Sequence, residues 1–132
     1  MKVLFVCVAN SGRSVIAERV FRAKARGRHD ARSAGSQPEA AAHPQVLEAL
    51  NELGIEASDH RPRKLDDESL RWADVIVATC DEACPVVPGK RYIAWQLPDP
   101  KNEPIERVRK IRDEIDRRVS DLLDELERQA SM

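Results

Sequence analysis

The chain has 132 residues, of which 42% are hydrophobic and 34% are charged, and its formal net charge at pH 7 is −1. A chain of this length builds one core, so we expect a single domain over residues 1–132. The near-zero net charge gives no indication of a nucleic-acid or membrane partner, and no apolar run approaches the ~20 residues of a membrane span. The first apolar stretch is shorter than that of a secretory signal and lacks a small-residue cleavage site after it, so we expect a cytoplasmic protein.

Two strands and two amphipathic helices are predicted in the first half of the chain. The segment KVLFVCV, residues 2–8, is apolar at both odd-numbered and even-numbered positions, which is typical of a strand buried on both faces of a parallel sheet. A helix is predicted over residues 14–26, and HDARSAGS predicts a second strand that breaks at Gly35. Residues 41–53 predict a second helix with Pro44 near its start, and the polar segment after it predicts a loop and a short helix.

The second half of the chain predicts two more strands and a long helix. ADVIVATC, residues 73–80, predicts a third buried strand, and KRYIAWQLPDP, residues 90–100, predicts a fourth strand followed by a proline-flanked loop. From Pro104 onward apolar residues recur every three or four positions, as in one amphipathic helix. Strands that alternate with helices predict an α/β fold with a parallel sheet covered on both faces, and ligands of such sheets bind at the carboxyl ends of the strands.

The first predicted strand ends at Cys7, and the helix after it begins near Arg13. The small residues between them allow successive backbone N–H groups to surround one centre, and a helix N-terminus adds a field that favours an anion. The planar guanidinium of Arg13 suits two oxygens of a tetrahedral oxyanion. We therefore predict an oxyanion-binding loop that comprises Val8, Ala9, Asn10, Ser11, Gly12, Arg13 and Ser14.

The same surroundings favour Cys7 as a nucleophile, because a helix N-terminus and a neighbouring arginine stabilise a thiolate. Ser14 can donate a hydrogen bond to the sulfur, and the side chain of Asn10 can tie the loop together. A free cysteine at a strand end is also common as a small buried residue. The composition of the loop favours the catalytic interpretation.

The chain holds three cysteines, Cys7, Cys80 and Cys84. An odd number in a cytoplasmic protein argues against a structural disulfide framework and favours a reactive or redox role. The three histidines have no metal-ligand spacing to any cysteine, so we predict no zinc site. A residue before a proline resists helix, so Pro85 predicts that the segment around Cys84 unwinds readily.

The segment VCVANSGRS resembles the phosphate-binding loop of the low-molecular-weight protein tyrosine phosphatase superfamily, which includes the thioredoxin-coupled arsenate reductases. The resemblance extends over most of the chain, through SAG, ADVIVATC, PDP and ERVRKIRDEI. It implies a four-stranded parallel sheet flanked by helices. It also implies that Cys7 is the nucleophile, Arg13 the oxyanion clamp and Asp99 the general acid. Proline on both sides restricts the backbone of Asp99, which suits a carboxyl group presented to a leaving oxygen, although a solvated turn has the same sequence.

The resemblance to the reductases implies a relay of three thiols. Cys7 attacks arsenate while Asp99 protonates the departing oxygen. Cys80 then attacks the arsenic adduct of Cys7, so that arsenite leaves and a Cys7–Cys80 disulfide forms. Cys84 next attacks Cys80, and thioredoxin or a similar thiol donor reduces the resulting Cys80–Cys84 disulfide. The expected function is arsenate reduction for arsenic detoxification by a monomer that needs no bound cofactor.

Two alternatives remain at this point. The first is a low-molecular-weight phosphatase that hydrolyses phosphate monoesters, because the loop is common to both branches. Phosphatases of this group carry tyrosines after the Asp-Pro pair, whereas Lys101 and Asn102 stand here, which favours a reductase with residual phosphatase activity. The second is a protein that only binds oxyanions or senses oxidants through Cys7. Some relatives bind potassium, but only Asn10, Glu18 and Ser33 match that ligand set and the aspartate position falls in HRPRK, so we predict no metal site.

Overall fold

The computed structural model of the chain describes residues 1–79 and 90–130, so the predicted redox residues Cys80 and Cys84 lie outside the described part. Within that part, four strands form one sheet in the order β2-β1-β3-β4, and each neighbouring pair is parallel. The strands are β1 (Lys2–Cys7), β2 (Asp30–Gly35), β3 (Val75–Ala78) and β4 (Arg91–Ala94). The predicted four-stranded parallel sheet is therefore confirmed.

The register brings the strand ends to one edge of the sheet. Cys7 pairs with Gly35 of β2, and Val6 pairs with Ala78 of β3. The chain leaves β1 for β2 on one side and later crosses to β3 on the other, so the direction of winding changes at β1. Ligands of open α/β sheets bind at this kind of switch point, which is where β1 delivers Cys7.

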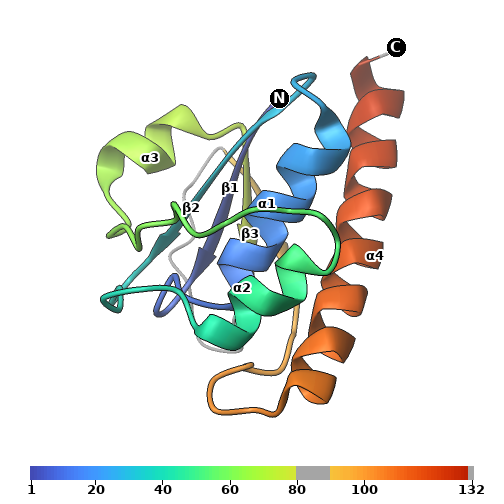
Figure 1. The fold of residues 1–132 in the computed structure, drawn as a ribbon. Helices are drawn as coiled ribbons and strands as arrows, with labels where there is room; N and C mark the ends of the chain where they lie inside the picture. The colour runs from blue at the N-terminus through green and yellow to red at the C-terminus, as the bar shows by residue number, and fades with distance from the viewer. Residues whose placement is uncertain (80–89, 131–132) are drawn as a thin grey trace.

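Helices cover both faces of the sheet (Figure 1). Helix α1 (Arg13–Ala25), α2 (Pro44–Asn51) and the long α4 (Ile105–Ala130) share one face, and the shorter α3 (Asp67–Trp72) packs on the other. Strand β1 contributes to both sides, because Val3 and Phe5 join the larger core while Leu4 and Val6 join the smaller one. Because both faces of β1 are buried, its apolar residues occur at odd-numbered and even-numbered positions alike.

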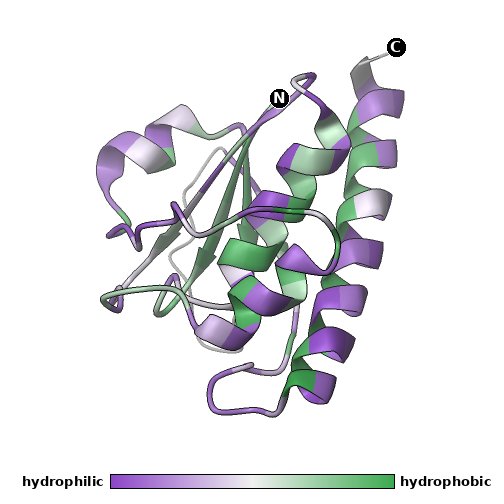
Figure 2. Cartoon of the chain, viewed as in Figure 1, coloured by the Kyte–Doolittle hydropathy of each residue, from purple (hydrophilic) through white to green (hydrophobic). Residues whose placement is uncertain are grey.

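Figure 2 shows hydrophobic residues along the strands and on the side of α4 that faces α1. The buried residues of α4 recur every three or four positions, as the sequence predicts, and include Val108, Ile111, Ile115, Val119, Leu122 and Leu126. Burial of such a stripe contributes about 25 cal/mol per Å² of apolar surface, so packing rather than intrinsic propensity stabilises this charged helix. None of the described helices is long and apolar enough to cross a membrane.

The second helix is shorter than predicted. It begins at Pro44 rather than near residue 41, because the residue before a proline resists the helical conformation. His43 is extended, and its backbone N–H donates to the carbonyl of Ser11 at 3.0 Å instead of entering a helix. At the other end, Gly54 has a φ of 77° and allows the chain to turn away. The shorter helix leaves residues 36–43 available to pair with the loop after β1.

Candidate active site

A cavity of about 110 Å³ lies at the carboxyl end of β1. It brings together three residues that the sequence predicts as catalytic, Cys7, Arg13 and Asp99, from three separate segments of the chain. A larger cavity, of about 760 Å³, is lined by residues of α1, the turns after α1 and α2, and α4, but by no cysteine. The size of a cavity therefore does not identify the active site. The convergence of a thiol, a guanidinium and a carboxyl group on the smaller cavity does. The remaining lining residues of the smaller cavity are Val8, Ala9, Ser11, Gly12 and His43.

Cys7 is 5% exposed and its sulfur has two polar contacts. The backbone N–H of Asn10 donates to Sγ at 3.2 Å, and Oγ of Ser14 lies 2.9 Å from the same sulfur. Nδ2 of Asn10 also donates to Oγ of Ser14 at 2.9 Å, which occupies an acceptor site of the hydroxyl and leaves its proton for the sulfur. Two donors directed at one sulfur stabilise a thiolate, the nucleophilic form of cysteine.

The loop between β1 and α1 turns its carbonyl groups outward. Each of the six carbonyl oxygens from residue 7 to residue 12 has a hydrogen-bond partner in a neighbouring segment, at residue 16, 36–43 or 60. The N–H and C=O groups of a trans peptide point in opposite directions. Carbonyls held outward therefore turn the following N–H groups inward, as the bond from Asn10 to the sulfur illustrates. Such a ring of N–H groups is a nest for an anion.

Two residues make this loop conformation possible. Asn10 is fully buried and has a φ of 51°, in the left-handed region that asparagine tolerates better than most residues. Its Oδ1 accepts from the backbone N–H of Arg63 at 2.9 Å, and its carbonyl lies 3.0 Å from Nε2 of His60. At the end of β2, a Cβ on Gly35 would lie 2.5 Å from the Val8 carbonyl oxygen, so the loop approaches too closely for any side chain there.

Arg13 is the first residue of α1 and its side chain closes the cavity. The residue is 9% exposed, and Nη1 donates to the carbonyl of Leu97 at 3.0 Å. A guanidinium has five N–H donors, so this one bond leaves others for an oxyanion. The Leu97 contact also ties the start of α1 to the segment that carries Asp99.

Asp99 is exposed at the mouth of the cavity, and its Oδ1 accepts from the backbone N–H of Lys101 at 3.0 Å. The segment lies directly against the nucleophile loop, because a Cβ on Gly12 would be only 2.8 Å from Cγ of Pro100. Gly12 thus permits the approach that brings the carboxyl group to the cavity. The described lining includes no Phe, Tyr or Trp side chain.

His43 lines the cavity, a role that was not predicted from the sequence. Its Nε2 lies 3.1 Å from Oγ of Ser11, and its backbone N–H bonds the Ser11 carbonyl. His60 likewise holds the loop from outside through Asn10. One signal in the sequence was the position of His43 directly before Pro44, at the helix start that follows β2. No local signal marks His60, since its partner lies 50 residues away.

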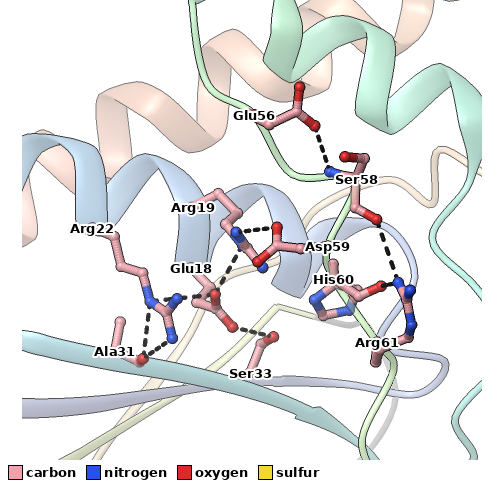
Figure 3. Close-up of polar contacts among 10 residues, drawn as sticks. All are labelled: Glu18, Arg19, Arg22, Ala31, Ser33, Glu56, Ser58, Asp59, His60 and Arg61. Carbon is pink, nitrogen blue, oxygen red and sulfur yellow. Dashed lines mark hydrogen bonds and ion pairs between the residues drawn. The ribbon is translucent and has the colours of Figure 1, made fainter.

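Glu18 and Ser33 lie behind the loop, where some relatives were expected to hold potassium (Figure 3). The buried carboxylate of Glu18 accepts from Ser33 Oγ at 2.7 Å and lies 3.2 and 3.4 Å from Nε of Arg19 and Arg22. Two guanidinium groups therefore neutralise this carboxylate. No group of three or more His, Cys, Asp or Glu side chains with metal-binding geometry occurs among the described residues.

The family model described as low molecular weight phosphotyrosine protein phosphatase matches residues 2–132. The chain belongs to this family. Its position there confirms the resemblance seen in the loop and in the later motifs.

Named relatives include both reductases and phosphatases. A putative arsenate reductase of Halobacterium salinarum is 33% identical, over 92% of this chain and 89% of that protein. The solved thioredoxin-dependent arsenate reductase of Corynebacterium glutamicum is 39% identical with a TM-score of 0.83, and the match covers 99% of this chain but 63% of that one. A low molecular weight protein tyrosine phosphatase of T. tengcongensis is 30% identical, over 95% and 99% of the two chains, with a TM-score of 0.84.

Proposed function

We propose that this protein reduces arsenate to arsenite, with Cys7 as the nucleophile and a thioredoxin-type dithiol as the electron donor. The observation that carries the proposal is the buried Cys7 sulfur at the floor of an anion nest, with Arg13 and Asp99 on the same small cavity. The relatives named as arsenate reductases, at 33% and 39% identity, support the reductase branch of the family. The expected location is the cytoplasm, where thiols are kept reduced.

In the first proposed step, the Cys7 thiolate attacks arsenic and an arsenic–oxygen bond breaks. Arg13 and the inward N–H groups hold the remaining oxygens, so charge that develops on them is stabilised by donors already in place. Asp99 gives its proton to the departing oxygen, which leaves as water. Arsenic is still pentavalent at this point, now bound to the sulfur of Cys7.

In the second proposed step, two electrons reach arsenic from sulfur. The Cys80 thiolate attacks Sγ of Cys7, the sulfur–arsenic bond breaks, and its electron pair stays on arsenic as arsenite. Cys84 then attacks Cys80 and releases the Cys7 thiolate, and a thioredoxin-type dithiol reduces the Cys80–Cys84 disulfide. These two roles rest on the sequence and on the family, because residues 80–89 lie outside the described part.

Steady-state turnover tests the whole relay. Purified protein with arsenate, thioredoxin, thioredoxin reductase and NADPH should consume NADPH only when arsenate is present. Cys7→Ser, Cys80→Ser and Cys84→Ser should each abolish that consumption, whereas Ser36→Ala, at an exposed serine next to the site, should retain it. Replacement of thioredoxin by glutathione and glutaredoxin identifies the donor class.

Single-turnover experiments separate the three cysteines. Without thioredoxin, the Cys84→Ser variant should still release one arsenite per protein and trap a Cys7–Cys80 disulfide. The Cys80→Ser variant should release none. A Cys84→Ser variant that turns over repeatedly with thioredoxin would contradict the assigned role of Cys84.

The alternative function is phosphate monoester hydrolysis, and the match to the T. tengcongensis phosphatase favours it. The absence of Phe, Tyr and Trp from the described lining argues against an aryl substrate. Hydrolysis of p-nitrophenyl phosphate that survives in Cys80→Ser and Cys84→Ser, without arsenate-dependent NADPH consumption, would establish the phosphatase. If neither arsenate reduction nor phosphate ester hydrolysis is detected, the remaining candidate functions are oxyanion binding and redox sensing through Cys7.

A further inference from the structure

A second cavity, of about 280 Å³, lies behind the nucleophile loop and outside the site described above. It is bounded by α1, by β2 and by the segment of residues 59–63 (Figure 3 shows most of its lining). Five arginines line it against two carboxylates, and Arg32 also pairs with Glu68 beyond the lining, so the net charge of the cavity is positive. The lining comprises Glu18, Arg19, Arg22, Arg32, Ser33, Asp59, His60, Arg61 and Arg63. We call it the arginine cavity.

The two carboxylates of the arginine cavity are already neutralised. Glu18 accepts from Ser33 and pairs with Arg19 and Arg22. Asp59 pairs with Arg19 at 2.9 Å and its side chain is 74% exposed, so it lies at the solvent side of the cavity. The two carboxylates of the lining are therefore paired with Arg19 and Arg22 and do not neutralise the other arginines.

Two of the arginines, both exposed, form no ion pair within the described residues, although the charge of Arg63 also acts on Asp66. In that part of the chain, Arg61 donates to the neutral backbone carbonyls of Ser58 and His60. The guanidinium of Arg63 has no hydrogen bond or ion pair within residues 1–79 and 90–130. Five donors on each guanidinium make a planar fork that matches the oxygens of phosphate or sulfate.

The buried pair of Glu18 and Arg19 does not add to this free charge. Nε of Arg19 and Oε2 of Glu18 both lack a hydrogen bond, but they lie 3.2 Å apart as an ion pair and face each other. The charge that remains for an oxyanion is therefore that of the arginines at the solvent side, Arg61 and Arg63.

We propose that the arginine cavity is a second oxyanion site, which binds a phosphate or sulfate group independently of the Cys7 loop. This proposal goes beyond the proposed function and does not depend on it. A cavity of about 280 Å³ is just below the range of ~300–1,000 Å³ typical of drug-sized ligands, which fits a free oxyanion or the phosphate group of a small molecule.

The arginine cavity shares two residues with the support of the nucleophile loop. His60 lines it and holds the Asn10 carbonyl, and Arg63 lines it and donates its backbone N–H to Oδ1 of Asn10. An anion that orders Arg63 and His60 therefore also orders the residues that keep Asn10 in its left-handed conformation. By linkage, ligands of the two sites strengthen one another when both stabilise that conformation.

Isothermal titration calorimetry with sodium sulfate tests the proposal, at an ionic strength held constant with sodium chloride. The Arg13→Ala variant removes the clamp and weakens binding at the nucleophile loop, so that the part of the remaining saturable binding that depends on Arg63 reports the arginine cavity. Adding Arg63→Gln to that variant should weaken the remaining binding by roughly tenfold or more, because a charge-assisted hydrogen bond is lost. Arg63→Gln removes no side-chain hydrogen bond or ion pair within the described residues, so circular dichroism should show an unchanged fold.

The matched control adds Arg128→Gln to Arg13→Ala. This variant removes the same charge near the carboxyl end of α4 and should bind sulfate as Arg13→Ala does. Repetition with inorganic phosphate and with adenosine monophosphate distinguishes a free oxyanion from the phosphate group of a larger molecule. The proposal is overturned if Arg13→Ala shows no saturable binding, or if Arg128→Gln weakens it as much as Arg63→Gln.

Discussion

The nucleophile loop and the arginine cavity both favour anions, but they are built from different parts of the chain. The loop uses backbone N–H groups that neighbouring segments hold inward, together with one guanidinium, Arg13. The arginine cavity uses side chains, and two of its guanidinium groups have no carboxylate partner among the described residues. One site is preorganised by the fold, and the other is a concentration of charge at its edge.

This difference determines how each site responds to mutation. A peptide group of the loop cannot be removed alone, so the loop fails when its geometry is disturbed. Electrostatic preorganisation of this kind contributes most to catalysis because the donors need no rearrangement during the reaction. A site built from several side chains loses affinity in steps as each is removed. Substitutions in the loop should therefore have larger effects than those among the surface arginines.

The largest effect after loss of Cys7 is expected for Arg13→Lys. An ammonium is a point charge that cannot grip two oxygens in a plane, and it cannot at the same time reproduce the bond to the Leu97 carbonyl. Loss of one preorganised donor of this kind lowers kcat by about 10²–10³. Steady-state arsenate reduction measures the effect, with Arg128→Lys as the control for charge-preserving substitution. Retention of activity within tenfold would show that the N–H groups suffice without the clamp.

The next effect tests the backbone of the loop directly through Gly35→Ala. The added Cβ would lie 2.5 Å from the Val8 carbonyl oxygen and 2.9 Å from the Asn10 nitrogen, so the loop must move. Overpacking of this kind destabilises a protein by about 1–3 kcal/mol, and the displaced N–H groups should also lower kcat/KM. Urea unfolding and arsenate kinetics provide the two measurements.

The control for Gly35→Ala is Gly54→Ala. Gly54 has a φ of 77° and open space around it, so alanine there adds backbone strain without touching the loop. It should cost stability by about 1 kcal/mol while the kinetic constants stay unchanged. Unchanged kinetics in Gly35→Ala as well would show that the loop tolerates displacement.

A smaller effect is expected from Asn10→Ala. This change removes the bonds to Ser14 and to the Arg63 backbone and also disfavours the left-handed φ of 51°. Unsatisfied buried partners cost about 1–3 kcal/mol, and the rate of Cys7 alkylation by iodoacetamide at pH 7 should fall with kcat/KM. Asn10→Gly restores the backbone conformation but not the bonds, so it should recover only part of the loss. Full recovery would mean that only the backbone conformation matters.

The fold was predictable from the sequence because its main signals are local. The apolar run of residues 2–8 and the regular apolar spacing after Pro104 depend only on neighbouring residues, and both elements are confirmed. The loop itself predicted that Cys7 and Arg13 share one anion site, whereas the convergence of Asp99 on the same cavity was foreseen only through the family resemblance. Proximity between segments more than 80 residues apart has no local signal.

The supports of the site could not be predicted for the same reason. The bonds of His60 and Arg63 to Asn10 join residues 50 and 53 positions apart, and their own segment carries only the pattern of a polar loop. The arginine cavity also escaped prediction, since its residues come from α1, β2 and that loop. The sequence comparison with potassium ligands located this region but not the guanidinium groups that surround Glu18.

The smallest expected effect is on stability at low pH, and it comes from the ion pairs of Glu52, which belong to neither anion site. Glu52 accepts hydrogen bonds from Arg109 and Arg112, which hold the pKa of its carboxyl group at about 2, below the ordinary value of 4.5. The unfolded chain therefore binds this proton at higher pH than the folded protein does. The stabilisation by Glu52 is complete above pH 4.5 and is lost as the pH falls toward 2. Glu52→Gln should flatten the dependence of the urea midpoint on pH in that window. An unchanged slope in Glu52→Gln would show that the ion pairs of Glu52 contribute as little to stability as most surface ion pairs.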